Sequence, residues 1–246
     1  MAKKSKSPVR RKSGPPPSRW RNDGWWSSTF AFAVPFILYL RTMAPTIYNL
    51  DSAELTTAAA TGGLVRATGY PLYLLIGRLW SHLPIGDVGY RMNLLSAVCG
   101  ALTVMLAERI LRRLGVGTWP RLAALGLLAV AQFFWALALI AEVYTLHTAI
   151  LAGVILALLR WSDRPTPGRL ALATFLVGIG FGNHVATVLA APGCVWFVLN
   201  AEPRKALEAR SLALAAAGLA AGFAVYLYLP LVYWTGPAFN YVGWFN

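Results

Sequence analysis

The chain has 246 residues, of which 57% are hydrophobic, and its formal net charge is +13. Its apolar segments are too long and too numerous for a soluble core, and they match the length of helices that cross a bilayer. The absence of period-two alternation argues against a membrane barrel. The basic residues punctuate the gaps between apolar segments instead of forming one patch, which excludes a nucleic-acid-binding role. The composition therefore predicts an all-α polytopic membrane protein.

The first 24 residues carry eight Lys and Arg residues and three consecutive prolines. This composition predicts a disordered basic arm, because it offers little apolar surface to bury. We expect the arm to remain in the cytoplasm and to contact anionic lipid headgroups. The rest of the chain, 25–246, is predicted to form one transmembrane domain, with 46–91 as its first extracytoplasmic loop.

Seven segments are predicted to span the membrane, at 25–45, 92–111, 121–140, 143–160, 169–182, 184–199 and 211–230. The shorter segment 70–83 contains Arg78, so we expect it to lie along the interface as an amphipathic helix. With this assignment, 18 of the 22 Lys and Arg residues fall on the cytoplasmic side, as the positive-inside rule requires. Residues 169–199 form either one long tilted helix or two spans. Three closely spaced glycines followed by Asn183 and His184 favour two spans with a break between them.

Asp51 and Glu54 are three residues apart in the first predicted extracytoplasmic loop. Carboxylates near hydrocarbon are costly, so both are candidates for a functional site. One interpretation is structural, with Asp51 at the N-cap of a helix over 52–61 and Glu54 completing a capping box. The other interpretation is a general base or a cation ligand, since a carboxylate in a partly dry cleft can accept a proton from a hydroxyl.

Other polar residues are predicted at the same ends of the segments. Arg66 and Arg78 either bind a lipid phosphate or extend to the interface, and Arg91 either holds its loop through carbonyl contacts or binds substrate. Glu142 is predicted to face Asp51 across a cleft. The full set of candidate binding residues is Arg66, Tyr70, Arg78, Arg91, Asn93, Glu142, Asn183 and His184.

Five short motifs occur in order along the chain: Asp51-Ser52-Ala53-Glu54-Leu55, Gly69-Tyr70-Pro71-Leu72, Tyr90-Arg91-Met92-Asn93-Leu94-Leu95, Ala141-Glu142-Val143-Tyr144-Thr145-Leu146 and Gly182-Asn183-His184. Together they resemble the transmembrane O-mannosyltransferase family that modifies IPT domains, and its bacterial relatives. The resemblance departs at Arg66-Ala67-Thr68, where the family usually has His-Pro-Pro. Relatives also continue beyond the region reached by 240–246, so we expect the chain to be C-terminally short relative to the family.

The resemblance implies a GT-C type glycosyltransferase that takes a hexose, such as mannose, from a polyprenyl-phosphate donor. The acceptor would be a hydroxyl of a protein or glycan on the extracytoplasmic side, with Asp51 as general base and Glu54 as the second catalytic carboxylate. No cofactor is firmly implied, and a divalent cation remains an open alternative. Two rival interpretations are a non-catalytic scaffold or accessory subunit of a membrane complex, favoured by the small-residue content, and a transporter. The transporter ranks last because no inverted repeat is apparent.

Overall fold

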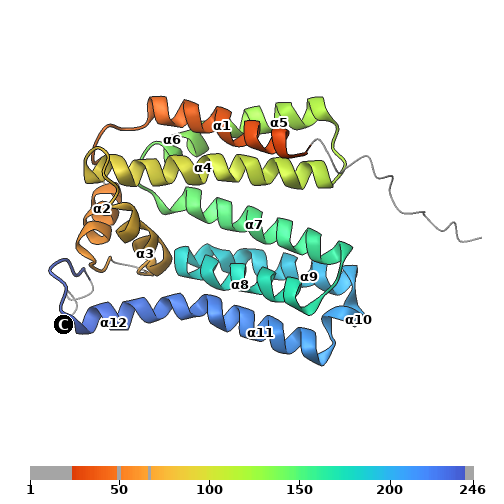
Figure 1. The fold of residues 1–246 in the computed structure, drawn as a ribbon. Helices are drawn as coiled ribbons and strands as arrows, with labels where there is room; N and C mark the ends of the chain where they lie inside the picture. The colour runs from red at the N-terminus through yellow and green to blue at the C-terminus, as the bar shows by residue number, and fades with distance from the viewer. Residues whose placement is uncertain (1–23, 49–50, 66–67, 242–246) are drawn as a thin grey trace, which may run out of the picture.

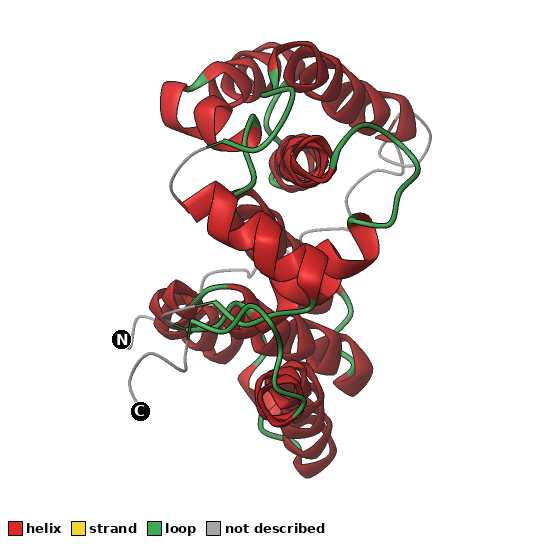
Figure 2. Cartoon of the chain, turned by 90° about the vertical axis from the view of Figure 1, so that its left-hand side faces the viewer, coloured by secondary structure: helices red, strands yellow, loops and turns green. Residues whose placement is uncertain are grey.

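The computed structural model describes residues 24–48, 51–65 and 68–241, so the predicted arm, apart from Gly24, lies outside the described residues. Within the described residues all regular structure is helical (Figures 1 and 2), apart from one isolated bridge between Leu64 and Asn240. The predicted all-α fold class is thus confirmed.

The long helices of the bundle are joined by short turns, and several are interrupted by brief irregular or 3₁₀ segments. In chain order the helices are α1 (Gly24–Thr42), α2 (Asp51–Thr61), α3 (Pro71–Trp80), α4 (Val88–Arg113), α5 (Thr118–Val130), α6 (Gln132–Ala138), α7 (Val143–Asp163), α8 (Pro167–Asn183), η2 (Val185–Ala190), α9 (Ala191–Ala201), α10 (Pro203–Ala206), α11 (Ala209–Phe223), η3 (Ala224–Leu227) and α12 (Tyr228–Trp234).

Three of the described helices are long and apolar enough to cross a membrane: α4, α7 and the continuous stretch Ala209–Trp234, which covers α11, η3 and α12. The pair α5 and α6 also qualifies, although its axis bends by 60° at Ala131. Shorter helices occupy the other ranges predicted to span, namely α1, α8, and η2 with α9. The chain is therefore an all-α membrane protein, and the number of seven spans stays a prediction.

The helices pack in a row, in which α1 contacts α4, α4 contacts α7, α7 contacts α8, and α8 contacts α11 (Figure 1). The contact between α8 and α11 depends on small residues. A Cβ atom added to Gly178 would lie 2.6 Å from the Leu219 carbonyl oxygen, and one added to Gly222 would lie 2.5 Å from that of Phe175. Only glycine permits this approach of two backbones, which is a common device for joining helices in membranes.

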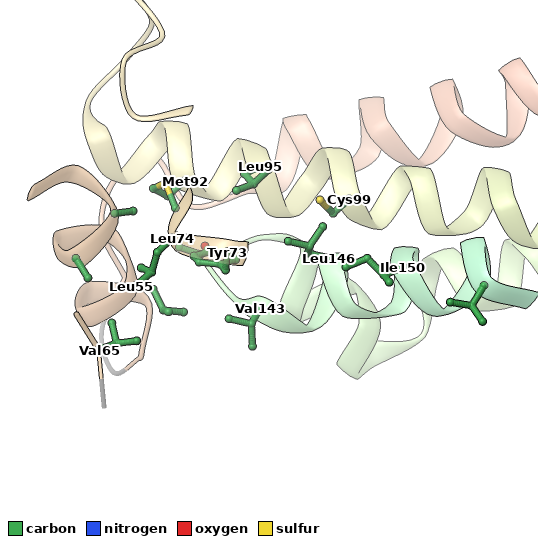
Figure 3. Packing of buried hydrophobic residues seen from close by; sticks show 14 of the residues in the cluster. Leu55, Val65, Tyr73, Leu74, Met92, Leu95, Cys99, Val143, Leu146 and Ile150 are labelled. Carbon is green, nitrogen blue, oxygen red and sulfur yellow. The ribbon is translucent and has the colours of Figure 1, made fainter. Parts of the chain in front are cut away.

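The short helices α2 and α3 pack against each other at one end of this row (Figure 1). Figure 3 shows how side chains from α2, α3, α4 and α7 meet in one hydrophobic cluster there. Its labelled members are Leu55, Val65, Tyr73, Leu74, Met92, Leu95, Cys99, Val143, Leu146 and Ile150. Burial of these apolar side chains fixes the helix that carries Asp51 against the beginning of α7.

The loop after α2 is joined to the segment that follows α12. The Leu64 amide donates to the Phe239 carbonyl at 2.9 Å, and the Tyr241 amide donates to the Leu64 carbonyl at 3.2 Å. Nearby, the Tyr228 hydroxyl donates to the Gly63 carbonyl at 3.1 Å. We call residues 63–64 together with 239–241 the clasp.

Two features predicted from local sequence are confirmed. Helix α3 begins at Pro71, where the fixed φ of proline and its missing amide proton suit a first turn. The chain also leaves helical geometry at His184, between α8 and η2. The bend at Ala131, by contrast, falls inside the segment 121–140 that we predicted as one span, and no proline or glycine marks it.

Candidate functional site

A small pocket of about 140 Å³ lies at the end of the bundle that carries α2 and α3. It is bounded by α2, by the residue preceding α3, and by the beginning of α7. The residues that line it are Asp51, Glu54, Leu55, Tyr70, Glu142, Val143 and Tyr144. Four predicted site residues from three separate parts of the sequence are thus brought together.

Helix α2 presents Asp51 and Glu54 to this pocket from its first turn. Acidic groups are favoured at this position, because the free amides of a helix N-terminus carry partial positive charge. The adjoining face of the helix is buried through Ser52, Leu55 and Thr56. The helix stops where Gly62 adopts a φ of 69°, a left-handed conformation that glycine accepts readily. The packing of one face therefore directs the two carboxylates toward the pocket.

Tyr70 reaches the pocket from an unusual backbone conformation. Its φ is 40° and its ψ is 49°, in the left-handed region that side-chain-bearing residues seldom occupy. It is the one described non-glycine residue with a positive φ. Such strain persists only where surrounding contacts hold it, and it concentrates at functional sites. Here Pro71 follows directly, and the Tyr70 ring stacks on the His184 ring with centroids 6.0 Å apart.

Glu142 supplies the third carboxylate, from the N-cap position of α7. Its amide donates to the Ser96 hydroxyl at 3.1 Å, which ties this residue to α4. Partial burial, reinforced by the negative charge of Asp51, raises the pKa of Glu142 to about 7. The pocket therefore holds one carboxyl group that is partly protonated at neutral pH, beside Asp51.

His184 stands behind the pocket in a cluster of rings. Its ring centroid lies 5.5 Å from that of Tyr144 and 5.2 Å from that of His147, and its Nδ1 accepts the Ala186 amide at 3.1 Å. The neighbouring Asn183 is fully buried and donates to the Val143 carbonyl at 3.0 Å. Asn183 and His184 thus contact the beginning of α7, where Val143 and Tyr144 line the pocket.

Like Asn183 and His184, three further predicted binding residues are not among those that line the pocket, and they make structural contacts. Arg78 donates to the Ala60 carbonyl near the end of α2. Arg91 donates to the carbonyls of Ser81, Ile85 and Gly86 at 2.5, 2.8 and 2.9 Å. These bonds fit the interpretation that Arg91 holds the loop before α4. Asn93 is fully buried and donates to the carbonyls of Ala44 and Thr46, both at 2.9 Å. Arg66 lies outside the described residues.

No group of three or more His, Cys, Asp or Glu residues in the described ranges is placed to hold a metal ion.

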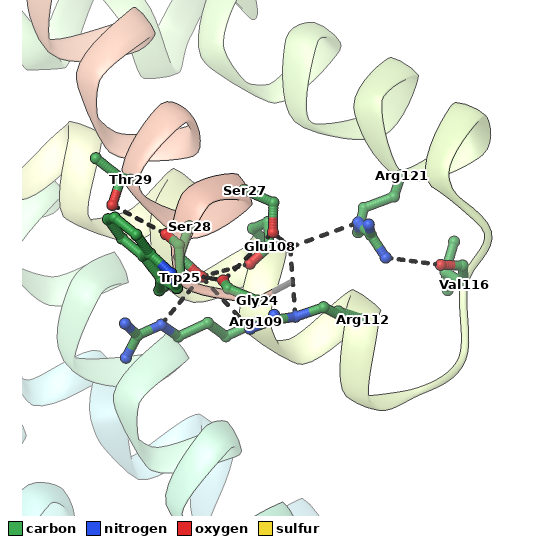
Figure 4. A network of polar contacts seen from close by, with 10 residues as sticks. All are labelled: Gly24, Trp25, Ser27, Ser28, Thr29, Glu108, Arg109, Arg112, Val116 and Arg121. Carbon is green, nitrogen blue, oxygen red and sulfur yellow. Dashed lines mark hydrogen bonds and ion pairs between the residues drawn. The ribbon is translucent and has the colours of Figure 1, made fainter. Parts of the chain in front are cut away.

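One buried acid was missed by sequence reasoning. Glu108 near the end of α4 is only 1% exposed, and it accepts hydrogen bonds from Ser27 at 2.9 Å and Ser28 at 2.8 Å in α1. Arg112 and Arg121 lie 3.5 and 3.6 Å from its carboxylate (Figure 4). The sequence signal for this ion pair was the position of Arg112, four residues after Glu108 and so on the same helix face. This network joins α1, α4 and α5, on helix turns remote from the pocket.

The fold and the pocket define a helical membrane protein with a carboxylate-lined site at one end of its bundle. Residues 51–207 match the family model described as the N-terminal domain of protein O-mannosyl-transferase TMEM260. Because the match covers more than half of the chain, this chain belongs to that family, which confirms the resemblance noted from its motifs.

Two relatives carry the same description. The chain is similar to protein O-mannosyl-transferase TMEM260 of Mus musculus, with 28% identity over 219 residues, covering 86% of this chain and 31% of the relative. It is also similar to the Dictyostelium discoideum protein of that name, with 23% identity over 180 residues, covering 66% of this chain and 22% of the relative. The chain thus spans less than a third of the length of these curated relatives. No solved structure matches it.

Proposed function

We propose that this chain is a membrane glycosyltransferase that transfers a hexose to a hydroxyl acceptor on the extracytoplasmic side. The observation that carries the proposal is the convergence of Asp51, Glu54 and Glu142 on one pocket at one end of a membrane helix bundle. The names of the relatives favour mannose as the sugar and a protein as the acceptor. A polyprenyl-phosphate sugar is the donor that suits a pocket beside the hydrocarbon layer.

In the proposed reaction, the acceptor oxygen attacks the anomeric carbon while the bond from that carbon to the donor phosphate breaks. The phosphate leaves with the electron pair, and Asp51 accepts the proton of the acceptor hydroxyl. Arg66 and Arg78 are the candidates for offsetting the charge that develops on the phosphate. Because Arg78 already contacts the Ala60 carbonyl, its remaining N–H groups would be the ones to serve the donor.

The other pocket residues have assignable roles in sugar binding. Glu142 can donate a hydrogen bond in its protonated form and accept one in its ionised form, and its raised pKa makes both forms available. Glu54 is one helical turn from Asp51 and would accept hydrogen bonds from sugar hydroxyls. The ring of Tyr70 offers an apolar face to the sugar ring, held in place by His184. Asn183 supports the beginning of α7 through its bond to the Val143 carbonyl. Arg91 fixes the loop before α4, and Asn93 holds the segment after α1.

The topology follows from the distribution of Lys and Arg residues. The pocket end of the bundle carries few of them, and the opposite end carries most, so we assign the pocket to the extracytoplasmic side and the N-terminus to the cytoplasm. The basic arm would then meet anionic lipid headgroups of the cytoplasmic leaflet.

The test is sugar transfer by the purified chain, supplied with polyprenyl-phosphate mannose and an acceptor protein. Asp51→Asn should lower turnover by about 10²- to 10⁴-fold, the usual contribution of a general base. Asp87→Asn is the matched control, because Asp87 caps α4 outside the pocket and asparagine caps helices equally well. Normal turnover by Asp51→Asn would refute the assignment of the base.

The scaffold interpretation makes the opposite prediction. In that case Asp51→Asn leaves glycan levels unchanged, and the protein co-purifies with a larger membrane complex whose activity resides in another chain. The close helix contacts at Gly178 and Gly222 are the observation in its favour.

A further inference from the structure

A second and larger cavity lies away from the carboxylate pocket and shares no lining residue with it. Its volume is about 210 Å³, and it is enclosed by parts of α7, α8, α9, α10 and α11. The lining residues are Val154, Leu158, Leu170, Ala173, Thr174, Val177, Cys194, Val195, Val198, Leu199, Ala206, Leu207, Leu212 and Ala215. We call it the aliphatic cavity.

The aliphatic cavity offers a ligand almost no hydrogen-bonding group. The hydroxyl of Thr174, its one lining alcohol, donates to the carbonyls of Ala171 at 3.0 Å and Ala215 at 2.8 Å. The other lining side chains are aliphatic, apart from the thiol of Cys194. Water gains little in such a space, because it needs several polar partners to remain bound. The occupant must therefore be a hydrocarbon.

The cavity opens toward the surface that faces lipid. Helix α9 contributes no fully buried residue to the protein, and Val195 and Leu212 are 56% and 50% exposed although both line the cavity. In a membrane these faces of α9 and α11 meet acyl chains directly. An acyl chain can therefore enter the cavity from the bilayer without crossing polar groups.

A basic rim borders the cavity where α10 joins α11. Arg204 lies two positions before the lining residue Ala206, and Arg210 lies two positions before the lining residue Leu212. Both arginine side chains are exposed. Neither arginine forms an ion pair with a described residue, whereas Lys205 pairs with Glu208 at 2.7 Å. Residues 202–210 contain three basic residues (Arg204, Lys205 and Arg210) and two acidic residues (Glu202 and Glu208), so the segment carries a formal charge of +1. A single lipid phosphate carries the complementary charge.

We propose that the aliphatic cavity binds one acyl chain of an anionic phospholipid whose phosphate contacts Arg204 and Arg210. The site is independent of glycosyl transfer, since it lies toward the end of α7 opposite Glu142. It would anchor α9 and α11 to each other through a bound lipid.

Native mass spectrometry of the purified chain, titrated with dioleoyl phosphatidylglycerol or dioleoyl phosphatidylcholine, tests the proposal. We expect one phosphatidylglycerol to bind more tightly than phosphatidylcholine. Loss of one interfacial arginine should weaken binding about fivefold, so Arg204→Gln with Arg210→Gln should weaken it roughly 25-fold. Arg164→Gln is the control for the single variants Arg204→Gln and Arg210→Gln, because Arg164 is exposed at the same end of the bundle and lies six positions from the nearest lining residues.

A second pair of variants tests the cavity itself. Val195→Trp should fill its mouth and abolish the tightly bound lipid, whereas Leu189→Trp, at a residue that is 80% exposed and outside the lining, should not. Equal affinity for the two lipids, equal loss of affinity in Arg164→Gln and in the single rim variants, or retention of the lipid by Val195→Trp would each overturn the proposal. A dimer that Val195→Trp dissociates would also overturn it, because a second copy would then be the occupant.

Discussion

The buried carboxylate of Glu108 allows the sharpest prediction about stability. It is the common acceptor for the hydroxyls of Ser27 and Ser28, and two arginines lie within 4 Å of it (Figure 4). Truncation to alanine would remove all of these contacts at once. It would also leave the side chain of Arg121, only 11% exposed, without its anionic partner.

Removing one partner of a buried charged network costs about 3–5 kcal/mol, because the remaining charge stays desolvated. Glu108→Ala should therefore destabilise the protein by about that amount. For a chain of this size, that corresponds to a fall in Tm of roughly 6–20 °C. Glu108→Gln keeps the volume and one acceptor oxygen, so it should cost about 1–3 kcal/mol.

The assay is thermal unfolding of the purified variants in one detergent, followed by circular dichroism or tryptophan fluorescence. The matched control is Glu208→Ala, which removes an acid whose ion pair with Lys205 is about half exposed on both sides. Such surface pairs contribute about 0–1 kcal/mol, so this variant should unfold close to the wild type. If Glu108→Ala and Glu208→Ala lowered Tm equally, the argument that the network joins the three helices would be wrong.

Three further outcomes are expected. Gly222→Leu should separate α8 from α11 and lower Tm by several degrees, whereas Gly193→Ala, which has open space, should not. The pKa of Glu142 is raised in the folded protein, so its contribution to stability should be present below pH 4.5 and lost as the pH rises through about 7. Over that pH range, the Tm of the wild type should therefore fall relative to the Tm of Glu142→Gln. Arg91→Ala should release the loop before α4 and increase cleavage after Trp80 in a timed chymotrypsin digest, with Arg164→Ala as the control.

The pH prediction has an internal check. Since the charge of Asp51 contributes to the raised pKa of Glu142, Asp51→Asn should move the transition to lower pH. An unchanged transition in that variant would mean that the two carboxylates do not interact.

Features that depend on local chemistry were predictable from the sequence. Pro71 predicts the beginning of α3, and the glycines before Asn183 predict the break after α8. The carboxylates of Asp51 and Glu54 were also identifiable, since acidic residues are scarce in this chain and these two stand between apolar segments.

Features that depend on partners far apart in the sequence were not predictable. Glu108 meets hydroxyls from residues 80 and 81 positions away, and Arg78 meets a carbonyl 18 positions away. The bend at Ala131 has no adjacent signal, because the nearest preceding glycine is Gly126, five positions earlier. The left-handed backbone of Tyr70 likewise reflects the packing of its ring and not a preference of tyrosine.

The clasp connects α2, which carries Asp51 and Glu54, to a distant part of the sequence. Its hydrogen bonds join the loop directly after α2 to residues 239–241, which lie about 180 positions further along the chain. A molecule that binds residues 239–241, or displaces them, would shift the C-terminal end of α2. The orientation of Asp51 and Glu54 would then change. Under the proposed function, such an event would change the rate of transfer without contact with the sugar.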